Sequence, residues 1–226
     1  MIQMVSAVMY NLSGLFLFAF LLYFKKQKHS EVFLKGYNLP FVVFSTSCVL
    51  ESFTHVLHLY HIEVSTNMWV LFYSFVETFF NGKLFQQMLP PQYHKFVYVY
   101  YVGFVVVFAF VHLMYSMEQR FVWDSIMVAF AGVAVFVLSF VWLAHTFAHM
   151  PDAKLFSNPN YLFVCGLVLY YAGTVLFFLL SQYLYTNSPN LLKLGYEINT
   201  FFTVTQRVFF IFGLWRLHKN YNTSYG

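Results

Sequence analysis

Seven long apolar stretches, separated by short connectors, fill almost the whole of this chain of 226 residues. A helix needs about 20 residues to cross the hydrocarbon core of a bilayer, and each stretch is of about that length. The sequence therefore predicts an all-α fold, a seven-transmembrane helix bundle that forms one domain over residues 1–226. The predicted spans are 3–24, 37–60, 67–86, 96–116, 122–147, 160–184 and 193–216.

The composition agrees with lipid as the solvent of this chain. Hydrophobic residues make up 60% of it and charged residues only 9%, whereas a soluble domain carries about 25% charged residues. The formal net charge of +4 does not indicate a nucleic-acid partner, because the basic residues cluster beside the predicted spans. The expected partner is the lipid bilayer.

The connectors differ in their Lys and Arg content, which predicts the orientation of the bundle. The connectors at one end, together with the C-terminal tail, hold Lys25, Lys26, Lys28, Lys35, Lys83, Lys95, Lys154, Arg216 and Lys219. The opposite end holds only Arg120 and Lys193. Because cytoplasmic connectors are enriched in Lys and Arg, we expect a cytoplasmic C-terminus and an N-terminus outside. The first apolar run has no basic segment before it, so it is expected to remain as a helix and not to act as a cleaved signal peptide.

Ionisable side chains inside the predicted spans mark a candidate site, because such residues are costly in a bilayer and usually face the bundle interior. The second span carries Glu51, His55 and His58. Their i, i+4, i+7 spacing places all three on one helix face, as a stripe. The candidate polar core or ligand-binding residues are Glu51, His55, His58, Glu77, His112 and Arg207.

Depth links three of these residues. At about 1.5 Å per residue, Glu51 and Glu77 are expected about 14 Å below the outer surface, and Arg207 slightly deeper. A buried arginine without a partner would be expensive, so Glu77 or Glu51 is predicted to pair with it. These residues form either a structural ion-pair network that orients helices or a ligand or proton site. The stripe on the second span is either a set of hydrogen-bonding groups, a metal or haem site, or a polar pocket open to the outside.

The histidine pair at the end of the fifth span has a different interpretation. His145 and His149 have metal-ligand spacing at i, i+4. They lie at the cytoplasmic end of the span, however, where histidines commonly sit at the membrane–water boundary. We expect them to be interfacial residues.

Two segments carry a family resemblance. One is Asn158-Pro159-Asn160-Tyr161 followed by Tyr170-Tyr171-Ala172-Gly173-Thr174 and a Phe-rich run to Ser181; the other is the Phe-Phe-Ile-Phe-Gly-Leu-Trp ending at 209–215. They resemble small, largely uncharacterised bacteroidete-type seven-helix integral membrane proteins, some of which accompany sensor histidine kinases. The resemblance covers about a quarter of the chain. It implies a bacterial inner-membrane sensor or accessory module with a sensor kinase as its partner, and it carries over no binding residues.

The residues and the resemblance together favour an integral membrane sensor or accessory module. We expect it to bind a small ligand in a polar pocket in its outer half and to signal to a separate cytoplasmic protein. An opsin is disfavoured, because a retinal Schiff base needs a lysine inside the seventh span and Lys193 lies only at its edge.

Two alternatives stay open. Seven-span zinc hydrolases of the ceramidase and adiponectin-receptor type use three histidines, and the chain resembles them in its intramembrane histidines but lacks their histidine pair in the last span. A zinc ion would then be bound by His55, His58 and His112, with Glu51 or Glu77 as general base, and a haem between the second and fourth spans is a related alternative. The third class is a proton-coupled transporter that uses the buried glutamates and Arg207.

Overall fold

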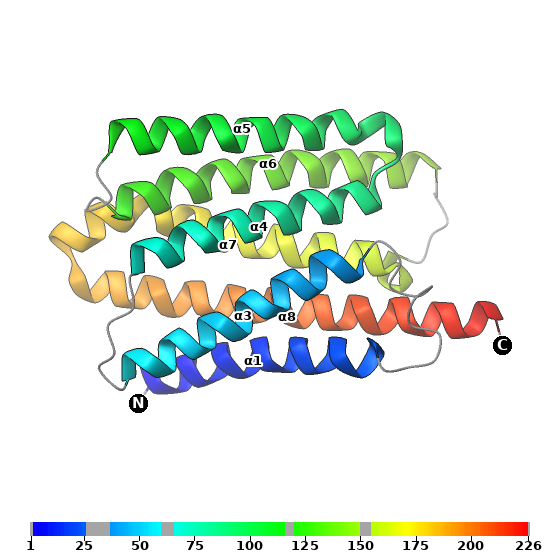
Figure 1. Cartoon of the computed structure of the whole chain (residues 1–226), viewed down its shortest axis with the longest axis horizontal. Coiled ribbons are helices and arrows are strands. Elements are labelled where there is room, and N and C mark those ends of the chain that lie inside the picture. The colour runs from blue at the N-terminus through cyan, green and yellow to red at the C-terminus, as the bar shows by residue number, and fades with distance from the viewer. Residues whose placement is uncertain (1, 26–36, 60–65, 116–119, 150–154, 226) are drawn as a thin grey trace.

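The computed structural model describes residues 2–25, 37–59, 66–115, 120–149 and 155–225. Within these ranges the chain forms seven α-helices and two 3-10 turns, and no strand (Figure 1). The α-helices are α1 (Ile2–Lys25), α3 (Asn38–Leu59), α4 (Thr66–Met88), α5 (His94–Met114), α6 (Arg120–His149), α7 (Pro159–Asn187) and α8 (Pro189–Tyr225); the turns are η1 (Pro91–Tyr93) and η2 (Leu155–Ser157). The predicted all-α fold is confirmed, and each helix overlaps one predicted apolar stretch.

Three helical segments in the described ranges are long and apolar enough to cross a bilayer. They are Pro91–Met114, Ser125–His149 and Pro159–Asn187, with mean hydropathies of 2.2, 2.6 and 2.2. Two shorter apolar helical segments, Val8–Tyr23 and Pro40–Leu50, accompany them. These lengths and compositions indicate a membrane protein.

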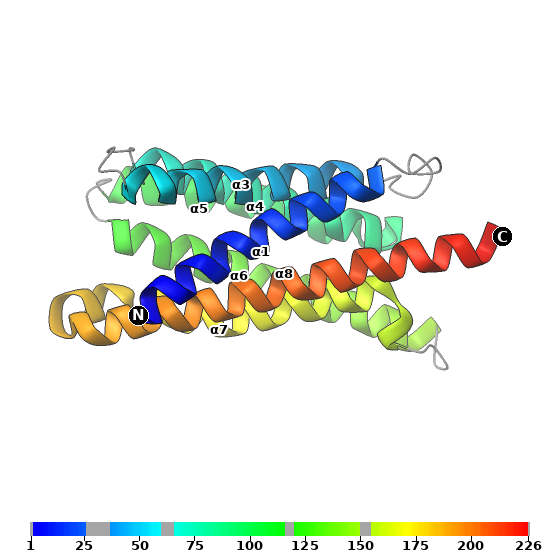
Figure 2. The ribbon, with the colours of Figure 1, turned by 90° about the horizontal axis from the view of Figure 1, so that it is seen from below.

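The helices form a closed ring. Each helix packs against the next one along the chain, and α8 returns to pack against α1 (Figures 1 and 2). Helix α4 also contacts α6 across the ring, so it leans toward the interior. We call the end of the bundle at which α1 and α8 begin the N-terminal end, and the end at which they finish the C-terminal end.

The junction of α7 and α8 differs from the sequence prediction. An eight-residue connector over 185–192 was expected, but only Ser188 separates the two helices. Side chains in the last turn of α7 bond back to its carbonyls: Thr186 Oγ1 donates to Gln182 O and Asn187 Nδ2 donates to Tyr183 O. These side chains bond within the helix, and the backbone N–H of Ser188 donates to Leu184 O, so the helix runs without a break to Asn187.

Helix α8 is much longer than a single crossing requires. Its 37 residues correspond to about 55 Å of helix, whereas the hydrocarbon core is about 30 Å thick. In Figures 1 and 2 the α7–α8 hairpin projects past the other helices at the N-terminal end, and α8 projects past them at the C-terminal end. The predicted span 193–216 therefore covers only the middle of this helix.

Helices α7 and α8 interlock through glycines that face aromatic rings. Gly173 on α7 lies against the ring of Phe202, and Gly213 on α8 lies against the ring of Phe163. Close approach of this kind needs small residues at the interface, so Gly173 and Gly213 lie on the face along which α7 and α8 pack.

Replacing Gly173 with alanine is expected to lower the free energy of unfolding by about 1–2 kcal/mol. The added methyl would lie 2.0 Å from Cδ2 of Phe202, and this overpacking outweighs the gain in helix propensity. Reversible unfolding in detergent gives the measurement. Ala172→Leu is the matched control, because Ala172 is exposed one residue earlier on the same helix and should change stability by less than about 0.5 kcal/mol. Equal stability of wild type and Gly173→Ala would contradict this packing.

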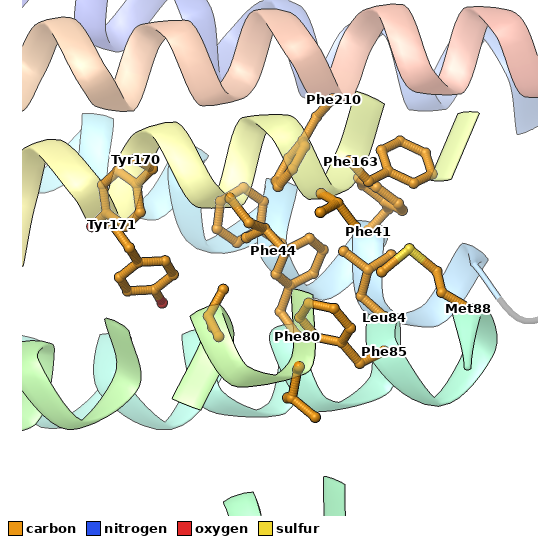
Figure 3. Packing of buried hydrophobic residues seen from close by; sticks show 14 of the residues in the cluster. Phe41, Phe44, Phe80, Leu84, Phe85, Met88, Phe163, Tyr170, Tyr171 and Phe210 are labelled. Carbon is orange, nitrogen blue, oxygen red and sulfur yellow. The ribbon is translucent and has the colours of Figure 1, made fainter. Parts of the chain in front are cut away.

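An aromatic cluster fills the core in the C-terminal half of the bundle (Figure 3). It consists of Phe41 and Phe44 from α3, Phe80 from α4, Phe163 from α7 and Phe210 from α8. All five are at most 2% exposed. Ring centroids lie as close as 4.4 Å, between Phe44 and Phe80, which is the contact range of aromatic pairs.

The outer faces of the helices are apolar. On α5, Val99 and Leu113 are 68% and 82% exposed, and α6, α7 and α8 each present further exposed valine, leucine or phenylalanine side chains. An exposed apolar surface of this extent is rare on soluble monomers. It fits contact with the lipid bilayer, as the composition predicted.

Candidate functional site

A chain of polar side chains joins α4 to α7 in the middle of the bundle. Glu77 and Asn81 stand one turn apart on α4, which places them on the same face of that helix. Tyr171 reaches between them from α7: its hydroxyl donates to Glu77 Oε1 at 2.8 Å and accepts from Asn81 Nδ2 at 2.8 Å. We call Glu77, Tyr171 and Asn81 the polar chain.

Burial differs along the polar chain. Tyr171 and Asn81 are each 1% exposed, whereas Glu77 is only partly buried. The aromatic cluster begins with Phe80, the residue before Asn81, and extends toward the C-terminal end. In Figure 3 the rings of Tyr170 and Tyr171 lie at the edge of this apolar packing. The polar chain is therefore closed on the C-terminal side by aromatic rings.

A second tyrosine lies beside the polar chain. The hydroxyl of Tyr100 on α5 is buried near Thr78, Asn81 and Glu77, but it makes no hydrogen bond of good geometry. Asn81 Oδ1 is also buried without a partner. Because Thr78 and Asn81 lie within reach of the Tyr100 hydroxyl, this tyrosine extends the polar surroundings of the polar chain to α5.

Arg207 forms the second polar centre, between α8 and α1. It is 0% exposed, and its Nη1 donates to the carbonyl of Tyr10 at 2.7 Å and to Ser13 Oγ at 3.1 Å. Its guanidinium carbon lies 4.2 Å from the centroid of the Tyr10 ring, which adds a cation–π interaction. The arginine thus joins α8 to α1 by hydrogen bonds and stacking.

A close helix crossing gives Arg207 its place. A methyl group on Gly14 of α1 would lie 3.1 Å from Cβ of Cys48 and 3.3 Å from Nη1 of Arg207. Helices α1, α3 and α8 therefore meet at this glycine. Glu51 follows Cys48 by one turn of α3, but its side chain lies outside the described residues. The pairing of Arg207 with Glu51 or Glu77 stays a prediction.

The histidines of the candidate site are described only in part. Helix α3 contains His55 and His58, whose side chains lie outside the described residues. The His112 side chain is exposed in the last turn of α5, where its ring lies parallel to Phe108 at 6.3 Å and edge-on to Trp123 at 6.1 Å. It is thus at the bundle surface and not in the polar chain.

Metal-ligating side chains do not cluster in the part of the chain that the structure describes. Among these residues, no three His, Cys, Asp or Glu side chains lie close enough together to hold a metal ion. The rings of His145 and His149 are tilted against each other with centroids 4.2 Å apart, and His149 Nδ1 contacts His145 O at 2.9 Å. A metal site that uses His55 and His58 remains a prediction.

Sequence reasoning missed two of the groups that hold Arg207. Ser13 is a serine in an apolar span, which carries no distinct signal, and the carbonyl of Tyr10 is a backbone atom that no side-chain pattern reveals. The small residue Gly14 beside them is a sequence signal for a close helix crossing at this point.

No model of a known protein family matches the sequence, and no curated protein and no solved structure was found to be similar to it.

Proposed function

We propose that the chain is a seven-span integral membrane protein that acts as a sensor or accessory module. In this proposal the N-terminal end lies outside and the C-terminal end lies in the cytoplasm of a bacterial inner membrane. A small ligand binds in the polar interior of the outer half, and a separate cytoplasmic protein receives the signal. The overlap of the seven helices with seven apolar stretches and the Lys/Arg asymmetry of their ends support this topology.

The partly exposed carboxylate of Glu77 at the head of the polar chain is the observation that carries the proposal. Glu77 bonds to the buried Tyr171, which in turn bonds to the buried Asn81. The aromatic cluster closes the polar chain on the side of the C-terminal end. A ligand arriving from the N-terminal end would therefore meet Glu77 first. Because the carboxylate accepts hydrogen bonds, it favours a ligand that carries a hydrogen-bond donor or a positive charge.

The contacts of the polar chain supply a route for the signal. A ligand that changes the Glu77–Tyr171 hydrogen bond alters the fit of α4 against α7. Helix α7 packs on α8 through the glycine–aromatic contacts, and α8 continues to the C-terminal end. A sensor kinase as the receiving protein rests on the resemblance of segments within 158–181 and 209–215 to bacterial seven-helix proteins.

The test compares wild type with Glu77→Gln, which keeps the shape and removes the charge. Both are purified in nanodiscs formed directly from the expressing membrane, and the small molecules that they retain are extracted and identified by mass spectrometry. We expect wild type to retain one molecule stoichiometrically and Glu77→Gln to retain at least tenfold less, because a hydrogen bond to a charged group contributes about 1.5–3 kcal/mol.

Glu197→Gln serves as the control, since Glu197 is a partly exposed glutamate near the start of α8 and lies outside the polar chain. Equal retention by wild type and Glu77→Gln, or no retained molecule in wild type, would contradict the proposal.

Proton-coupled transport is a second candidate, and the continuous hydrogen bonding from Glu77 through Tyr171 to Asn81 favours it. Carboxylates within the membrane take part in proton relays of pumps and transporters, and Glu77 would be the group that carries the proton. If the chain is a proton-coupled transporter, we expect Glu77→Gln to abolish proton flux in liposomes and Glu197→Gln to leave it unchanged. The zinc and haem alternatives depend on His55 and His58, and metal analysis and the visible absorption spectrum of the purified protein test them.

A further inference from the structure

The C-terminal end of the bundle carries a rim of basic side chains. Lys83 near the end of α4, Lys95 at the start of α5, and Arg216 and Lys219 on α8 all lie toward this end (Figure 1). We call these four residues the basic rim. At the opposite end, Lys193 is the one lysine or arginine whose side chain the structure describes.

One part of the basic rim is built around a tryptophan. Trp215 is 42% exposed, the guanidinium carbon of Arg216 lies 5.1 Å from its ring centroid, and Nζ of Lys219 lies 5.7 Å from it. Two cations are thus gathered over one aromatic ring that faces outward. Tryptophan is enriched at the boundary between hydrocarbon and headgroups, so this arrangement places both cations at headgroup depth.

The same pairing recurs on a separate part of the rim. Nζ of Lys95 lies 5.4 Å from the ring centroid of Phe96. Helices α5 and α8 lie on different sides of the bundle in both Figure 1 and Figure 2. Two distant surfaces with the same cation–aromatic pairing at the same end indicate one surrounding layer, not one local pocket.

Basic residues outnumber acidic ones in the sequence at this end, where the connectors and the tail hold nine Lys and Arg residues but only Glu31 and Asp152 as acids. Of the acidic residues whose side chains are described, Glu77 lies in the interior and Glu197 in the third turn of α8 at the opposite end. The net charge of the sequence at the C-terminal end is therefore positive. An anionic surface is its electrostatic complement.

We propose that the basic rim binds the phosphate groups of anionic phospholipids. The planar guanidinium of Arg216 suits a bidentate contact with phosphate oxygens, and the lysines act as flexible point charges. Trp215 and Phe96 hold the cations at the level of the headgroups. The proposal concerns lipid only, and it is independent of what the polar chain binds.

The experiment uses the full chain in nanodiscs of phosphatidylcholine alone or mixed with phosphatidylglycerol. Phosphatidylglycerol binding is measured by native mass spectrometry of the released protein over a series of lipid fractions. In the double variant Arg216→Gln/Lys219→Gln we expect binding to weaken about 25-fold, from about fivefold for each charge lost near the surface. Rising salt should weaken wild-type binding as well.

Lys193→Gln at the opposite end is the matched control and should leave the binding unchanged. Lys95→Gln, on the α5 side of the rim, gives an independent measurement if the double variant fails to fold, and should weaken binding about fivefold. Equal binding by wild type and a folded rim variant would overturn the proposal. The same holds if inorganic phosphate added to the mixed nanodiscs displaces phosphatidylglycerol, because the rim would then be a site for the free ion.

Discussion

Replacing Arg207 with alanine is expected to lower the free energy of unfolding by about 3–5 kcal/mol, which is the cost of breaking a buried charged contact and leaving a cavity. The side chain is 0% exposed and holds α8 to α1 through the Tyr10 carbonyl, Ser13 Oγ and the Tyr10 ring. All of these contacts would be lost together. Equilibrium unfolding in mild detergent, followed by circular dichroism, measures the loss.

One further variant separates charge from geometry at Arg207, and a second supplies a control on the same helix. Lysine keeps the positive charge but lacks the planar fork that stacks on an aromatic ring, so Arg207→Lys should recover only part of the lost stability. Arg216→Ala is the control on the same helix, because Arg216 lies at the rim and not in the core; its expected effect on stability is below about 0.5 kcal/mol. If Arg207→Ala and Arg216→Ala were equally stable, the joint between α1 and α8 would not rest on Arg207.

Replacing Tyr171 with phenylalanine is expected to destabilise the protein by about 3 kcal/mol. The ring, which is 1% exposed, keeps its packing in this variant, so the change isolates the hydroxyl. Its removal takes away the donor seen at Glu77 Oε1 and the acceptor seen at the buried Asn81 Nδ2. Each buried polar group left unsatisfied costs about 1–3 kcal/mol.

Tyr183→Phe provides the matched control for Tyr171→Phe. Tyr183 lies on the same helix but is 64% exposed, so loss of its hydroxyl should be nearly neutral. A double-mutant cycle of Tyr171→Phe with Glu77→Gln adds a direct test of the contact, and residues in one hydrogen-bond network couple by about 0.5–3 kcal/mol. A coupling energy of zero would show that the hydroxyl and the carboxylate do not interact.

Much of the fold follows from hydropathy. Apolar runs of bilayer length have few alternatives to a helix, since every backbone polar group must be satisfied within the segment. The ends of α8 could not be predicted in this way. The hydropathy of the sequence falls at Arg216 and Lys219, so the predicted span ends at 216. The helix nevertheless continues to Tyr225.

The candidate site was predictable in its residues but not in its pairings. Glu77 and Arg207 stood out because charged residues are rare in apolar spans. Their described partners, Tyr171 and the carbonyl of Tyr10, lie 94 and 197 residues away in the chain, and only the rotation and tilt of the packed helices bring them together. The aromatic cluster was not visible either, because 31 phenylalanines give no sequence signal that separates core rings from lipid-facing ones.

The unbroken end of α8 has a practical consequence for imaging. At 26.7 kDa, and embedded in a detergent or lipid belt, the protein offers little mass outside the belt for aligning particle images. Because α8 remains helical beyond the ends of its neighbours, a soluble helical protein fused in phase with its last turns would project at a fixed angle. Such a fusion would provide a rigid fiducial without altering the bundle.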